Sequence, residues 1–157
     1  MRQRSSDLPL PAHEKAVAAL DEFDATAAEY VALLDTQRAL LGQGNALGVA
    51  ESVARGDALA LRAAACGRRL APIREALAGA GIRGPRAEAV RRRLERMAHR
   101  AALLGSAAAE VAARCERERV TMGSELAQLQ KPAGGGRGGA YRYPPAPRPT
   151  VTLDTRG

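Results

Sequence analysis

The apolar residues between Arg86 and Gln130 recur at alternating steps of four and three, which places them on one face of a long helix. Such a helix spans about 65 Å, which is too long to be buried in a compact domain of 157 residues. We therefore expect it to pack lengthwise against another helix or against a partner. The apolar positions are Val90, Leu94, Met97, Ala101, Leu104, Ala108, Val111 and Cys115, followed by Met122, Leu126 and Leu129.

Two earlier segments repeat this helical spacing, so the chain has three candidate helices. The first begins near Ala12, and the second follows a glycine-rich stretch between Gly42 and Gly48. Each glycine costs about 1 kcal/mol of helix stability relative to alanine, which predicts either a break or a softened stretch of helix. The apolar positions are Leu20, Phe23, Ala27, Tyr30, Leu34 and Leu41 in the first segment, and Leu59, Ala63, Cys66, Leu70, Ile73 and Leu77 in the second.

Local signals predict where these helices begin, bend and end. The stretch Arg55–Asp57 predicts a turn in which Asp57 caps the second helix. Pro72 lacks a backbone donor and predicts a kink inside that helix. Glycines between residues 79 and 84 end it, and Pro85 suits the first turn of the third helix.

Composition favours an elongated helical domain over residues 12–130. The chain is 46% hydrophobic, but it holds one Phe, three Tyr and no Trp, and much of the apolar fraction is alanine. Alanine has the highest helix propensity and lets two helices approach closely, whereas a wide core needs larger side chains. We expect an all-α fold, either an elongated antiparallel helical hairpin or a three-helix bundle.

The two ends of the chain lack this periodicity. Residues 1–11 contain two serines and two prolines, and we expect a flexible N-terminal lead-in. Residues 131–157 hold a glycine run and then a proline-rich stretch with Tyr141 and Tyr143. Such a composition buries too little apolar surface to offset the entropy cost of ordering. We expect a disordered tail, which is either plain linker or carries the two tyrosines as a docking motif.

The formal net charge of +7 admits acidic partners, including nucleic acid and anionic membrane surfaces. The interspersed Glu88 and Glu95 dilute the basic cluster at the start of the third helix, and no aromatic residue lies nearby to stack on bases. We interpret the cluster as a solvated helix face, with an acidic protein or, less favoured, nucleic acid as alternatives. Its members are Arg83, Arg86, Arg91, Arg92, Arg93, Arg96 and Arg100.

No grouping of residues predicts catalysis, a cofactor or a metal site. The Gly134–Gly139 run lacks the flanking strand and helix of a phosphate-binding loop. Cys66 and Cys115 fall on apolar stripes as free thiols, and His13 and His99 lack ligand spacing. No segment resembles a signal peptide or reaches about 18 apolar residues. We expect a cytoplasmic binding protein without enzyme activity, cofactor or membrane insertion.

The third helix carries the residues that we expect to bind a partner, because its distal half extends beyond the first two helices. Methionine suits an adaptable groove, since thioethers repack around different apolar surfaces. Glu118 occupies an apolar position and is expected to be open to water or paired with a partner's cation. Alternatively, part of the stripe packs on the first two helices. The predicted contacts are Leu104, Val111, Met122, Leu126 and Leu129.

Several segments resemble the FlgN-type flagellar export chaperones. They are the leucine-rich segment Tyr30–Leu41, the Arg55–Leu59 turn into a second helix, and the long third helix. A tyrosine followed by prolines and the ending Leu153–Gly157 are also similar. The resemblance covers nearly the full chain. It implies a cytoplasmic chaperone of type III export that holds hook-associated flagellar subunits before secretion and delivers them to the export apparatus.

Two other interpretations stay open. In a self-associating coiled-coil protein, the same apolar stripe closes a homodimer whose mass depends on concentration. In an arginine-rich nucleic-acid binder, affinity for RNA or DNA falls steeply with salt.

Overall fold

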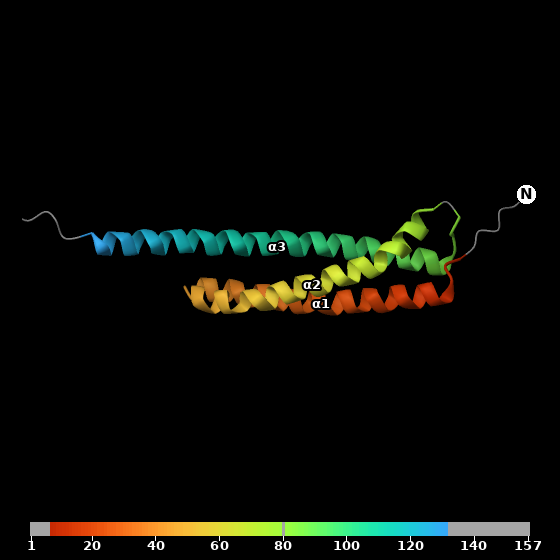
Figure 1. Cartoon of the computed structure of the whole chain (residues 1–157), viewed down its shortest axis with the longest axis horizontal. Coiled ribbons are helices and arrows are strands. Elements are labelled where there is room, and N and C mark those ends of the chain that lie inside the picture. Colours follow the sequence, from red (N-terminus) through yellow and green to blue (C-terminus); the bar gives the residue numbers. More distant parts are fainter. Residues whose placement is uncertain (1–6, 80, 132–157) are drawn as a thin grey trace, which may run out of the picture.

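The structure, a computed structural model, describes residues 7–79 and 81–131, and nearly all of them are helical. Helix α1 spans Leu10–Gly42, α2 spans Ala46–Ala78 and α3 spans Pro85–Gln130. Figure 1 shows that α2 runs antiparallel to α1, whereas α3 runs parallel to α1 along the same long axis. The predicted all-α fold is confirmed, as a three-helix bundle in which α3 is longer than α1 and α2.

The glycine-rich stretch is a break between α1 and α2. Gly44 has a φ of 69°, a left-handed conformation that favours glycine. The side chain of Asn45 accepts a hydrogen bond from the backbone N–H of Gly48 at 2.9 Å and so caps the first turn of α2. These two devices reverse the chain between the last residue of α1 and the first residue of α2.

The turn predicted at Arg55–Asp57 is wrong, because α2 continues through it. Gly56 lies close to α1, and a Cβ added there would be 3.8 Å from the Tyr30 ring. Val49 and Leu59, which precede and follow this stretch, are both buried. Tertiary packing on either side of the glycine therefore overrides the local turn signal.

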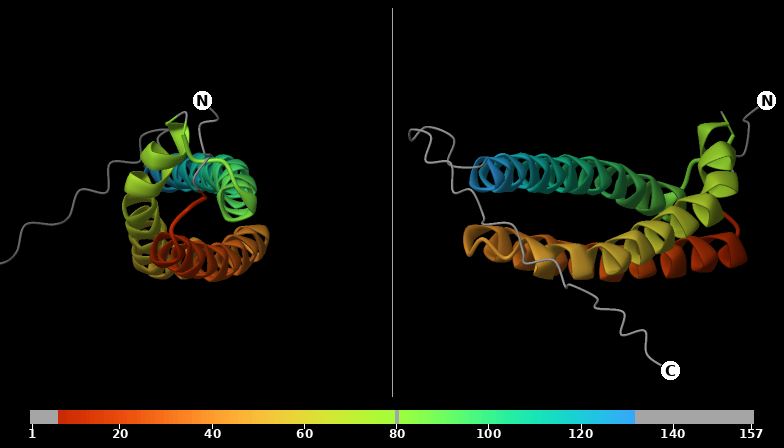
Figure 2. Two further views of the ribbon diagram at one scale, coloured as in Figure 1. Left: turned by 90° about the vertical axis from the view of Figure 1, so that its right-hand side faces the viewer. Right: turned by 60° about the vertical axis from the view of Figure 1, so that its left-hand side comes forward.

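Pro72 lies inside α2 without ending it, as predicted. Proline removes one helical hydrogen bond and bends the helix, and the C-terminal part of α2 turns away from the line of its first part (Figure 1). Figure 2 shows the result, in which α2 approaches α3 mainly near the α2–α3 connection. Nearer the α1–α2 turn, α2 and α3 are apart.

Residues 7–11 differ from the flexible lead-in expected for residues 1–11. Leu8 is 2% exposed and belongs to the core. The Asp7 carboxylate accepts hydrogen bonds from the backbone N–H of Ala87 at 3.1 Å and from Nε of Arg86 at 3.0 Å. This segment therefore ties the start of α1 to the start of α3. Residues 1–6 and the tail predicted from residue 131, apart from Lys131, lie outside the described residues.

The core is a row of small clusters along the bundle. Each cluster joins α1 to one or both of the other helices, which suits a chain with few large aromatic side chains. The last cluster lies next to the α1–α2 turn and includes Val111, with Cys115 packed against it. The clusters contain Leu20, Leu70 and Val90 at one end, Phe23, Ala27 and Cys66 in the middle, and Leu34, Leu41, Val49 and Val111 at the other end.

Candidate partner-binding surface

The apolar stripe of α3 has a covered part and an uncovered part. Leu104 is half-buried and packs against the middle and last core clusters. Val111 is 6% exposed and packs with Leu34 and Leu41 of α1. Cys115 is the last stripe residue that packs against a core cluster. From Arg119 onward, every described residue of α3 is exposed.

The uncovered part extends past the α1–α2 turn (Figure 1). It contains Met122, Leu126 and Leu129, whose side chains are 42%, 58% and 81% exposed. Their spacing places them on one face, continuous with Val111 and Cys115. Within residues 7–79 and 81–131, no helix covers this face. We call Arg119–Gln130 the distal segment.

An apolar groove lies where the covered part of α3 ends, and its volume is about 340 Å³. Its floor is α1, with Tyr30 and Leu34, and its walls come from α2 and α3. The residues that line the groove lie in the part of the bundle next to the α1–α2 turn, where the ribbons of α2 and α3 are apart (Figure 2). The α2 wall includes Val49, Val53 and Asp57, and the α3 wall includes Ala108, Val111, Ala112, Cys115, Glu116 and Arg119.

The five predicted contact residues divide between these environments. Leu104 and Val111 pack within the bundle, although Val111 also lines the groove. Met122, Leu126 and Leu129 are exposed on the distal segment. The predicted docking residues Tyr141 and Tyr143 lie outside the described residues.

Sequence reasoning missed the groove residues of α1 and α2. Tyr30 is half-buried, and Val53 is 50% exposed beside it. Val53 lies two residues before the stretch wrongly predicted to be a turn, so its place on a helix facing α3 was not evident. The signal that points to this site is an apolar residue beside the buried stripe of α2, namely Val53 next to Val49.

The charged groups that α3 places beside the groove are paired within that helix. Glu118 accepts a hydrogen bond from Nε of Arg114 at 3.3 Å, so it has a cation from its own helix. Arg119 and Glu116 form two hydrogen bonds, of 2.7 and 2.9 Å. These bonds lower the pKa of Glu116 and raise that of Arg119. Cys115 at the groove is a free thiol.

Most of the predicted arginine cluster pairs with carboxylates of the chain itself. Arg93 donates to Asp21 at 2.7 Å and to Asp24 at 3.0 Å, and Arg100 donates to Asp24 at 3.3 Å. The hydrogen bond that Arg93 donates to Asp21 outweighs burial and raises the pKa of Arg93. This pairing leaves less free positive charge for nucleic acid than the sequence implies. Two further pairs are Arg86 with Asp7 and Arg92 with Glu88.

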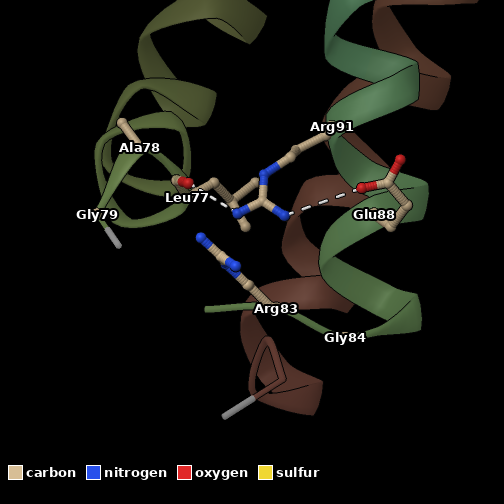
Figure 3. A pocket seen from close by; sticks show the side chains of 7 residues that line it. All are labelled: Leu77, Ala78, Gly79, Arg83, Gly84, Glu88 and Arg91. Atoms are coloured by element: carbon tan, nitrogen blue, oxygen red, sulfur yellow. Dashed lines mark hydrogen bonds and ion pairs between the residues drawn. The ribbon is translucent and has the colours of Figure 1, made fainter. Parts of the chain in front are cut away.

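A polar pocket of about 420 Å³ at the α2–α3 connection has a structural role. Arg91 donates to the backbone carbonyl of Leu77 at 2.9 Å and to that of Ile82 at 2.7 Å. Figure 3 shows Arg91 reaching from α3 toward the end of α2, with Arg83 beside it and Glu88 4.0 Å away. The carbonyls at a helix C-terminus lack helical donors, so Arg91 supplies donors where α2 ends.

The described part of the chain has neither a metal-binding group of side chains nor a membrane-spanning helix. No three His, Cys, Asp or Glu side chains there are grouped to hold a metal ion. None of the described helices is long and apolar enough to cross a membrane.

Comparison of the chain with protein-family models, with curated proteins and with solved structures finds no match. The exposed face of the distal segment and the adjoining groove are therefore the main basis for a functional proposal.

Proposed function

We propose that this chain is a helical chaperone that binds an amphipathic helical segment of a partner protein. The observation that carries the proposal is the continuous apolar surface formed by the distal segment and the groove. A helix laid on this surface would extend the packing that α1 provides to the earlier part of α3. Binding of an amphipathic helix in an apolar groove is a recurrent mode of recognition.

The energetics require the partner to use both parts of the surface. Full burial of Met122, Leu126 and Leu129 contributes roughly 5–9 kcal/mol, reduced by the area that is already buried. Loss of translational and rotational freedom costs about as much or more. The distal segment alone is therefore a weak site, and stable capture needs a large apolar side chain of the partner in the groove.

The resemblance to FlgN-type chaperones supports a more specific proposal. In it, the partner is a hook-associated flagellar subunit held in the cytoplasm before type III export. The tail with Tyr141 and Tyr143 then recruits components of the export apparatus. The ion pairs of Arg93 and Arg100 favour this binding role over nucleic-acid binding, because they neutralise part of the basic face.

Affinity capture tests the proposal. The tagged full chain is recovered from its own host after nuclease treatment, and the bound proteins are identified by mass spectrometry. We expect flagellar export subunits that carry an amphipathic helix. Recovery of the chain alone, or of nuclease-sensitive material, would contradict the proposal.

A further inference from the structure

One helix face and one groove of this chain are apolar, and no described residue covers the face or fills the groove. The distal segment exposes Met122, Leu126 and Leu129. The groove between α2 and α3 exposes Val53 at its α2 wall, and no described residue fills its volume of about 340 Å³. The α3 wall of the groove and the distal segment are neighbouring stretches of α3, and the C-terminal part of α3 lies at the same end of the bundle as the α1–α2 turn (Figure 2).

The two surfaces match in length and in shape. From Met122 to Leu129 a helix rises about 10 Å, as does the stretch of α1 from Tyr30 to Gln37 that floors the groove. Ala108 and Ala112 of the α3 wall are small, so the backbone of an incoming helix can approach closely. Gly123 of the distal segment has no side chain and has open space around it. The backbone of the distal segment can therefore also approach a neighbouring helix closely.

We propose that the groove is filled by the distal segment of a second copy of this chain. The α3 helices of the two copies cross antiparallel, so that each distal segment lies in the groove of the other copy. Each site is then incomplete without a residue from the partner copy. In the register that fits both surfaces, Leu126 lies on Ala112 of the second copy and Met122 lies near its Cys115.

Charge at the centre of this dimer is balanced. Glu116 and Arg119 both line the α3 wall of the groove and pair within one chain. In this register the two-fold axis passes close to Arg119, so the Arg119 side chains of the two copies meet there, and each keeps the ion pair with Glu116 of its own chain. Each copy thus contributes one cation and one anion to the centre of the dimer, so no isolated charge is buried.

Antiparallel pairing satisfies both surfaces, whereas parallel pairing does not. In a parallel pair, one distal segment lies beside the other and both grooves stay empty. The antiparallel arrangement is isologous and closes as a dimer. The dimer covers the apolar face of the distal segment when no client is bound. Because the client of the proposed function binds the same face, client binding and dimer formation exclude each other.

Disulfide formation tests the arrangement. Within one chain, residues 115 and 122 are two helical turns apart, about 10 Å, which is beyond the reach of a disulfide. Cys66 is fully buried and cannot compete. Mild oxidation of full-length Met122→Cys should therefore give a covalent dimer that links position 122 of one copy to Cys115 of the other. Val120→Cys, also on the distal segment but on its opposite face, should give no link to Cys115.

Sedimentation without oxidation gives an independent readout. We expect the unmodified chain to be dimeric at micromolar concentration, with Leu126→Asp raising the dissociation constant about tenfold or more, and Val120→Asp leaving it unchanged. A monomeric unmodified chain, a link between two copies of position 122, or equal effects of the two aspartates would overturn the dimer. Since no client is present, these results do not decide the proposed function.

Discussion

The carboxylate of Asp7 lies 3.1 Å from the backbone nitrogen of Ala87 and accepts its hydrogen bond. A residue that precedes α1 thus caps the first turn of α3, 80 positions away in sequence. Leu8 is buried directly beside it. This hydrogen bond holds the first turns of α1 and α3 next to each other, with the two helices running in the same direction. It thereby sets how far α3 extends past the α1–α2 turn.

Stability at low pH should depend on Asp7. Burial alone would raise its pKa, but hydrogen bonds from Ala87, Arg86 and Leu8 outweigh it and lower the pKa from 3.8 to about 2. Because the folded-state pKa is lowered, this group stabilises the fold above about pH 4, and the contribution disappears as pH falls toward 2. Urea unfolding of Asp7→Asn should show a weaker fall over this range than the unmodified chain. Identical pH profiles would contradict the cap.

Core and distal residues should differ sharply in their effect on stability. Leu70 is fully buried, and Leu70→Ala should lower the free energy of unfolding by about 2–5 kcal/mol. Leu126 is 58% exposed, and Leu126→Ala should change it by about 0.5 kcal/mol or less when the chain is kept monomeric by dilution. Denaturation followed by circular dichroism measures both. A large loss in Leu126→Ala would place this residue in the core of the folded chain.

The α1–α2 turn offers a matched pair of glycines. Gly44 has a positive φ of 69°, so Gly44→Ala should destabilise the fold by about 1 kcal/mol. Gly42 ends α1 and has nothing within 4 Å of an added Cβ. Gly42→Ala should therefore be neutral or stabilise the fold by up to about 1 kcal/mol. Thermal unfolding of both variants checks the prediction, and a shift of equal sign would contradict the described turn.

The helical part of the fold was largely predictable from sequence, and α3 most of all. Its stripe is regular from Val90, and Pro85 marks its first turn, so both bounds agree with Pro85–Gln130. Pro72 was also correctly placed inside a helix. These features depend on local periodicity and backbone chemistry, which a single sequence contains.

Other features depend on tertiary packing and were missed. Leu8 belongs to a short segment with no periodicity, so its burial has no local signal. The stretch Arg55–Asp57 has the composition of a turn but is held helical by packing on both sides. The groove depends on where α2 and α3 separate, and no spacing within one helix shows that distance. The exposure of the distal residues was predicted because α3 extends beyond α1 and α2.

The central claim is that the apolar face of the distal segment binds the partner, and one comparison tests it most directly. The partner recovered by affinity capture is titrated onto Leu126→Asp and onto Val120→Asp, which place the same charge on opposite faces at similarly exposed positions, 58% and 60%. We predict that Leu126→Asp, and more strongly Met122→Asp with Leu126→Asp, abolishes binding while helicity is retained, and that Val120→Asp binds like the unmodified chain. Full binding by the Leu126→Asp chain would contradict the claim.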